Sequence, residues 1–272
     1  MFFRLTPVVK NLVIINVLLL IIKAFVPLTF MGYTINDLLS LHYVGADKFM
    51  FSQFVTHMFM HADFMHLLSN MIGLIAFGPN LEMVWGPKRF LIFYFVTGLG
   101  AAACQMTAHY FDLASSLQLI DDFLADPSLG VFQTLMDGNA FKLNPAALAE
   151  FQDNVNQIAS YDQAGALSQA TSYATDIRYF LINSFQMVGA SGAVLGIAMG
   201  FALYFPNTEL ILFPIPIPIK AKYLVMGYGA FEVYSAWANL PGDTVAHFAH
   251  LGGMVFGYFL IRYWNAKRNQ FY

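Results

Sequence analysis

Long apolar runs separated by shorter polar segments dominate the pattern along the chain. A helix needs about 20 predominantly apolar residues to cross a lipid bilayer. Candidate segments of that length lie at 12–31, 62–80, 90–108, 185–205, 222–240 and 245–264. The second and the fifth carry polar residues inside them. The pattern predicts an all-α, polytopic membrane protein built as a six-transmembrane-helix bundle.

The composition favours the same class. Of the 272 residues, 58% are hydrophobic and 11% are charged, whereas soluble domains carry about 25% charged residues. The net charge of −3 offers no basic surface, so we expect membrane lipid and no nucleic acid as partners. The single cysteine, Cys104, excludes an internal disulfide framework and a cysteine-based zinc site.

Basic residues orient the predicted spans, because Lys and Arg gather in the cytoplasmic loops of membrane proteins. With a cytoplasmic N-terminus, most of the 13 basic residues fall on the cytoplasmic side: Arg4, Lys10, Lys88, Arg89, Lys220, Lys222, Arg262, Lys267 and Arg268. An even number of spans then places the N- and C-termini both in the cytoplasm. A compact six-span chain without a targeting segment fits the bacterial inner (plasma) membrane.

An acidic block interrupts the apolar pattern between the third and fourth spans. It divides the chain into three predicted domains. Residues 1–108 hold transmembrane helices 1–3, residues 109–178 form a soluble outer-face insertion, and residues 179–272 hold transmembrane helices 4–6. Asn144 followed by Pro145 predicts one helix start in the block, and Asp162 predicts another. The block is either a tolerated loop insertion or a helical cap that controls access to a site.

Polar side chains inside membrane spans are costly and therefore indicate function. With a rise of about 1.5 Å per residue and a hydrocarbon core of about 30 Å, Ser191 of the fourth segment lies about 9 Å below the outer surface. By the same rise, His250 of the sixth segment lies about 8 Å deep. His66 and Asn70 share a helical face in the outer half of the second segment. These side chains converge on one level.

Glycine spacing favours close contact between the fourth and sixth segments. Gly192, Gly196 and Gly200 recur every four residues in the fourth. Gly253 and Gly257 continue a line of small residues in the sixth. Small residues at this spacing let membrane helices approach closely, as a serine–histidine hydrogen bond requires.

The converging residues fit acyl-transfer chemistry. A serine hydroxyl attacks an amide only when a base removes its proton, and His250 is the candidate base for Ser191. The resulting oxyanion needs donors, which Asn70, His66 and the backbone N–H of Ser191 supply. We identify no carboxylate partner for His250 in the sequence, which favours a Ser–His dyad. Glu232 is expected in the outer half of the fifth segment, where it snorkels or lines an aqueous cavity.

Other histidines have simpler interpretations. His57 and His61 lie at the outer edge, where they are expected to be structural. His247 is one turn from His250 and is expected to face elsewhere. A metal-dependent membrane enzyme is the alternative that uses all the histidines near one face, but no His-Glu-x-x-His motif and no carboxylate ligand complete such a site.

Taken together, these motifs resemble the rhomboid family of intramembrane serine proteases. The matching elements are His61, His66 and Asn70 in a His-x4-His-x3-Asn run, Glu82-Met-Val-Trp-Gly86-Pro-Lys-Arg89-Phe90, Gly189-Ala-Ser191-Gly192 and Ala249-His250-Leu-Gly-Gly253. The resemblance implies a serine endopeptidase that cleaves transmembrane proteins near the outer membrane surface. It implies Ser191 as nucleophile, His250 as base, His66 and Asn70 at the oxyanion hole, and neither a cofactor nor a metal.

Two points stay open beside this resemblance. Many relatives carry an aromatic residue four positions after the serine, where this chain has Leu195. The alternative function is a catalytically inactive rhomboid-like protein that binds helices or serves quality control. No pattern in the sequence specifies the substrate or an oligomeric state.

Overall fold

The computed structural model describes residues 5–26, 29–30, 32–137, 141, 144–212, 215–238 and 245–268. Helices make up most of these ranges, which confirms the predicted helical class. The chain divides into two compact units. The first comprises Met1–His42, Phe49–Met106 and Gln186–Tyr272, and the second comprises Tyr43–Lys48 and Thr107–Phe185.

Long helices build the first unit. They are α1 (Pro7–Phe25), α4 (Phe64–Trp85), the first part of α5 (Pro87–Ala125), α9 (Ser191–Tyr204), α10 (Ala221–Ala238) and α11 (His247–Arg268). Short elements join them: β1 (Thr29–Phe30), β2 (Tyr33–Thr34), α2 (Ile35–Leu39), β3 (Leu41–His42), α3 (Gln53–Thr56), η1 (His57–Phe59), β4 (Gln186–Met187), β5 (Glu209–Leu212) and β6 (Ile215–Lys220). The strands form antiparallel pairs, β1 with β2, β3 with β4, and β5 with β6.

Local sequence signals set the limits of α4. The Asp63 side chain accepts a hydrogen bond from the backbone N–H of His66 and caps the first turn. Gly86, with φ of +79°, ends the helix, since glycine adopts this left-handed conformation without strain. Near this end, the Glu82 carboxylate accepts the backbone N–H groups of Val8 and Val9, each at 3.0 Å. A buried carboxylate in α4 therefore holds the N-terminal turn of α1.

Several helices suit a membrane. By length and composition, α1, α4 and α5 could each cross a bilayer, and α9 is a shorter apolar helix. These helices are compatible with the predicted membrane bundle. The count of six spans stays a prediction.

The structure corrects three predicted helix limits. The first apolar helix begins at Pro7, not at residue 12, because proline is favoured in the first helical turn. Helix α5 does not end at 108 but continues to Ala125. Helix α9 begins only at Ser191, six residues after the predicted start of the fourth span, because β4 and a glycine with positive φ precede it.

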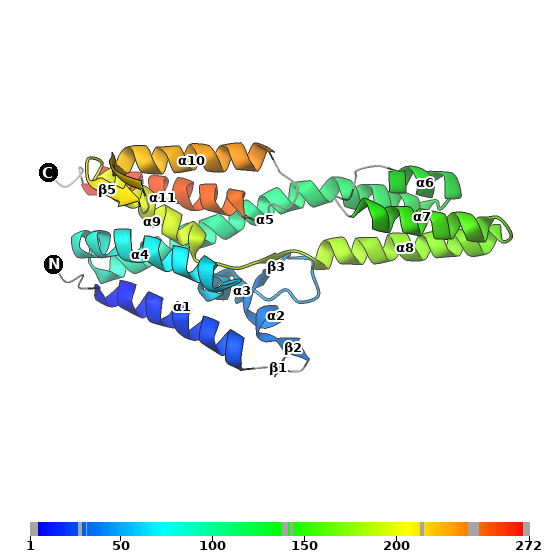
Figure 1. Cartoon of the computed structure of the whole chain (residues 1–272), viewed down its shortest axis with the longest axis horizontal. Coiled ribbons are helices and arrows are strands. Elements are labelled where there is room, and N and C mark those ends of the chain that lie inside the picture. Colours follow the sequence, from blue (N-terminus) through cyan, green and yellow to red (C-terminus); the bar gives the residue numbers. More distant parts are fainter. Residues whose placement is uncertain are drawn as a thin grey trace. The chain divides into compact units, whose positions relative to one another are not determined.

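The predicted glycine contact between α9 and α11 is confirmed. A Cβ built on Gly253 of α11 would clash with the carbonyl oxygen of Gly192 in α9. A Cβ on Gly257 would lie 3.0 Å from the carbonyl oxygen of Gly196. The two backbones are therefore in direct contact, as small residues allow. Helix α9 also packs against α4 and α10, and all four helices lie together in Figure 1.

The second unit is a helical bundle with its own core. It combines the end of α5 with α6 (Leu129–Asp137), α7 (Pro145–Ala159) and α8 (Gln163–Asn183). Asn144 caps α7 and Asp162 caps α8, as the sequence predicts. The core gathers apolar side chains from all four helices, among them Phe123, Phe132 and Ala170. The predicted domain limits and the role of this bundle as an insertion stay predictions.

Candidate functional site

The backbone of the segment before α9 fixes the position of Ser191. Gly189 has φ of +126°, a conformation that favours glycine, and its backbone N–H donates to the carbonyl oxygen of His57 at 2.9 Å. Helix α9 then starts at Ser191, after Ala190. The N–H groups of a first helical turn have no partner within the helix. The backbone N–H of Ser191 is therefore available to an acceptor beside its own hydroxyl.

Ser191 and His250 meet, as the sequence predicts. The Ser191 Oγ lies 2.9 Å from the His250 Nε2, within hydrogen-bond distance. The His250 ring is buried, and the two residues lie 59 positions apart in the sequence. The glycine contact between α9 and α11 brings the two helices close enough for this bond.

A carboxylate supports the His250 ring. Glu232 of α10 lies with its Oε1 2.8 Å from the His250 Nδ1 and its Oε2 2.6 Å from the His247 Nδ1. Tyr228 lies one turn before Glu232 on the same helix and interacts electrostatically with this carboxylate. Glu232 is 1% exposed. The expectations that His250 lacks a carboxylate partner, that Glu232 snorkels and that His247 faces elsewhere are therefore wrong.

His66, in the first turn of α4, lies beside Ser191 of α9. A Cβ built on Gly189 would be 2.8 Å from the His66 Nε2 and 3.6 Å from the Ser191 Oγ. The ring is therefore close to the serine hydroxyl, across the space that Gly189 leaves free. The other nitrogen, Nδ1, faces the backbone N–H of Ala62 at 3.5 Å. Because that long contact needs an acceptor, it favours a proton on Nε2, toward Ser191.

Asn70 is buried one turn after His66. Its Nδ2 donates to the carbonyl oxygen of His66 at 3.0 Å, and Ser69 Oγ donates to the same oxygen at 3.0 Å. The amide nitrogen has a second proton that this bond does not use. Participation of Asn70 in an oxyanion hole stays a prediction.

The two outer histidines are buried, each 1% exposed. Burial lowers the pKa of His57 and of His61 to about 4, so both rings are neutral at pH 7. The His57 Nδ1 hydrogen-bonds the carbonyl oxygen of Gln53 at 2.8 Å. The His61 ring lies edge-on to His66, with ring centres 5.1 Å apart. The hydrogen bond of His57 supports its structural interpretation, whereas neither ring nitrogen of the buried His61 has a hydrogen-bond partner.

Within the described ranges, Glu232, His247 and His250 form a group that could hold a metal ion. One ligand atom from each lies within 4.8 Å of the others, and two histidines with a glutamate are a donor set that zinc accepts. The expectation that no carboxylate completes a histidine site is therefore wrong. In the structure, hydrogen bonds from the two rings to the carboxylate join the same atoms.

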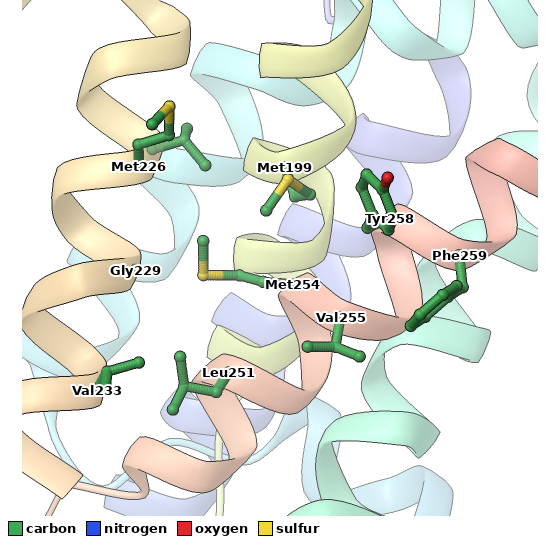
Figure 2. Close-up of a pocket in the computed structure, with 10 residues that line it drawn as sticks. Met199, Met226, Gly229, Val233, Leu251, Met254, Val255, Tyr258 and Phe259 are labelled. Atoms are coloured by element: carbon green, nitrogen blue, oxygen red, sulfur yellow. The ribbon is translucent and has the colours of Figure 1, made fainter. Parts of the chain in front are cut away.

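An apolar pocket lies between the helices that carry these residues. It measures about 390 Å³ and is lined by α9, α10 and α11, with Met199, Gly229 and Met254 on its walls. Figure 2 shows that side chains of α10 and α11 face each other across it. Its lining residues include no carboxylate, histidine or serine. Ser191, Glu232, His247 and His250 are therefore not among the residues that line this pocket.

Comparisons with known proteins identify the family of this chain. The sequence profile of a family described as "Rhomboid domain" matches residues 48–130 and 142–266, which is more than half of the chain. A protein of Arabidopsis thaliana, "RHOMBOID-like protein 12, mitochondrial", is 35% identical over 74 residues, 27% of this chain and 22% of that protein. The chain thus aligns with less than a quarter of this relative. On the extent of the profile match, the chain belongs to the rhomboid family.

Proposed function

We propose that this protein is an intramembrane serine protease that cleaves transmembrane proteins near the outer membrane surface. The observation that carries the proposal is the 2.9 Å contact between the Ser191 Oγ and the His250 Nε2. A half-buried serine hydroxyl and a buried imidazole at this distance can act as a nucleophile and its base. Family membership supports the same activity, because serine proteolysis is what the resemblance to rhomboids implies.

The reaction proceeds through an acyl-enzyme. Ser191 Oγ attacks the carbonyl carbon of the scissile peptide bond while its proton passes to the His250 Nε2. The tetrahedral intermediate collapses, the C–N bond breaks, and His250 gives this proton to the leaving amine. Water then attacks the ester, again losing its proton to His250, and Ser191 regains a proton when the carboxylic acid leaves. No metal or cofactor takes part in these steps.

The oxyanion of each tetrahedral intermediate needs preorganised donors. The proposal assigns this role to the Ser191 backbone N–H, the His66 Nε2–H and the free amide proton of Asn70. The position of His66 beside Ser191 supports its part. The first-turn position of Ser191 supports the backbone donor, because the helix dipole also favours negative charge there.

The proposed substrate is a transmembrane helix that approaches laterally between the second and fifth spans, α4 and α10. Its upper part must unwind, because the hydrogen bonds and side chains of a helix protect its peptide bonds. Residues with low helix propensity near the cleavage site reduce that cost, by about 1 kcal/mol for glycine relative to alanine. We therefore expect cleavage next to small or helix-breaking residues.

The proposed topology has six spans with both termini in the cytoplasm, supported by the distribution of basic residues. The bacterial inner membrane stays our proposal from the sequence, whereas the plant relative is mitochondrial by its name. A membrane-impermeant maleimide tests the topology on single cysteines introduced into a Cys104→Ser background. Cysteines near Lys88 and Lys220 should react only from the cytoplasmic side, and labelling from the outer side would contradict the topology.

Cleavage of a model transmembrane substrate tests the proposed activity. Ser191→Ala should abolish cleavage and leave the protein folded. Ser235→Ala, which removes a buried hydroxyl from α10, is the matched control and should keep the wild-type rate. Full activity of Ser191→Ala would refute the proposal. Substrate binding without cleavage by the wild-type protein would favour the inactive helix-binding alternative.

A further inference from the structure

Glu232 is a carboxylate in a buried position, where an ionised side chain is costly unless other groups compensate it. Its side chain is 1% exposed and lies in α10, among helices of the membrane bundle. A buried carboxylate is stable only when hydrogen bonds or opposite charges compensate its lost hydration. The compensating groups are the rings of His247 and His250 from α11, each of which hydrogen-bonds the carboxylate. Each carboxylate oxygen serves a different histidine.

We infer that Glu232 is a positioning residue, which fixes the tautomer and the orientation of the His250 ring for reaction with Ser191. The inference rests on the proposed protease function, since it assigns a further residue to the same reaction. It replaces the dyad expected from the sequence with a Ser191–His250–Glu232 relay of hydrogen bonds. In this role Glu232 acts through the His250 ring, which it hydrogen-bonds.

The tautomer follows from the donors and acceptors. An ionised carboxylate only accepts hydrogen bonds, so the His250 Nδ1 at 2.8 Å from it carries the proton. A neutral imidazole has one protonated nitrogen, which leaves Nε2 as an acceptor. This nitrogen faces the Ser191 Oγ at 2.9 Å. The carboxylate therefore selects the tautomer that can take the serine proton, and its charge stabilises the imidazolium that forms.

His247 fixes the carboxylate itself. Its Nδ1 donates to the Glu232 Oε2 at 2.6 Å, on the oxygen that His250 does not use. Two donors on two oxygens hold the plane of the carboxylate, so the ring of His250 cannot turn without losing its bond. The apolar side chain at Leu195 offers no hydrogen bond to this ring. Orientation of His250 therefore depends on α10.

Kinetics on the full-length protein in proteoliposomes test this role. Glu232→Gln keeps the size of the side chain but removes its charge, and it places an NH2 donor in front of one of the two rings. We expect kcat to fall by about 10²–10⁴-fold, as for loss of a carboxylate that orients a catalytic histidine, with KM within about twofold of wild type. Glu82→Gln changes another buried carboxylate, which holds α1, and should keep kcat.

A spectroscopic measurement reads the tautomer directly. Nitrogen NMR of protein with ¹⁵N-labelled histidine, assigned with His250→Ala, distinguishes a protonated ring nitrogen from a bare one. At neutral pH the wild-type His250 should carry its proton on Nδ1. A proton on Nε2 would overturn the inference, even if Glu232→Gln were inactive for reasons of folding.

The outcomes separate the inference from the proposed function. Cleavage by Ser191→Ala would refute the protease itself. Loss of cleavage in Ser191→Ala, with kcat of Glu232→Gln within twofold of wild type, would overturn only the role of Glu232. Cleavage that stops with a strong chelator and returns with added zinc would assign Glu232, His247 and His250 to a metal and would also overturn it.

Discussion

Gly189 donates its backbone N–H to the carbonyl oxygen of His57 at 2.9 Å. This bond ties the segment before the nucleophile to the buried turn of η1. At φ of +126°, Gly189 also leaves free the space between the His66 ring and the Ser191 hydroxyl. The position of Ser191 thus depends on the packing of α9, on the backbone hydrogen bond between Gly189 and His57, and on the lack of a side chain at Gly189.

Gly189→Ala should therefore inactivate the protein. The new methyl group would lie 2.8 Å from the His66 Nε2, and the backbone strain adds about 1–3 kcal/mol. We expect substrate cleavage to fall by at least about 10²-fold, the size of the loss of an oxyanion donor. Gly86→Ala is the matched control, since Gly86 has φ of +79° but no neighbour near the added Cβ. It should lose stability and keep kcat, whereas near-normal activity of Gly189→Ala would contradict this account.

The oxyanion assignment predicts that Asn70→Ala lowers kcat by about 10²–10³-fold. The side chain also donates to the carbonyl oxygen of His66, and Ser69 donates to that oxygen at the same 3.0 Å. Ser69→Ala therefore controls for loss of that bond and should stay near wild type. His66→Ala should resemble Asn70→Ala. Equal rates for the Asn70 and Ser69 variants would remove Asn70 from the oxyanion hole.

Acid should destabilise the protein through His57. Because burial lowers the pKa of this ring to about 4, the unfolded chain binds a proton below about pH 6.5 that the folded chain does not. The free energy of unfolding then falls with falling pH, by about 2 kcal/mol between pH 6.5 and pH 5. His57→Gln should abolish this part of the loss, as measured by unfolding in mixed micelles at several pH values. Parallel pH dependences of the two proteins would exclude the effect.

The contact between α9 and α11 predicts that even one added methyl group at this contact lowers the free energy of unfolding. Gly253→Ala places a methyl group in direct clash with the Gly192 carbonyl oxygen. Since overpacking alone costs about 1–3 kcal/mol, we expect at least that loss in the free energy of unfolding. Gly227→Ala in α10 meets no neighbour within 4 Å and should be neutral or stabilising. A tolerated Gly253→Ala would show that the helices can separate.

The meeting of Ser191 and His250 could be predicted from the sequence because helix rise is constant and both residues lie in apolar segments. The small residues on α9 and α11 further predicted how close the helices come. The caps at Asn144 and Asp162 were also predictable, because capping depends on a few neighbouring residues. Each of these predictions depends either on a few neighbouring residues or on the constant rise of a helix.

The partnership of Glu232 was not predicted. It depends on how α10 is rotated about its axis, and the tertiary packing of three helices decides that rotation. A carboxylate within an apolar span was the available signal, but depth alone did not show which helix it faced. The length of α5 was missed for another reason. Polarity rises after residue 108, yet no glycine or proline interrupts the helix before Pro127.

A serine-directed fluorophosphonate tests the central claim most directly, because its reaction requires an activated serine and no substrate. After labelling of the purified protein, peptide mass spectrometry should find the adduct on Ser191. His250→Ala should prevent its formation, and Ser235→Ala should not. An adduct that forms equally in His250→Ala, or none on Ser191 in a folded wild-type protein, would contradict activation of this serine by this histidine.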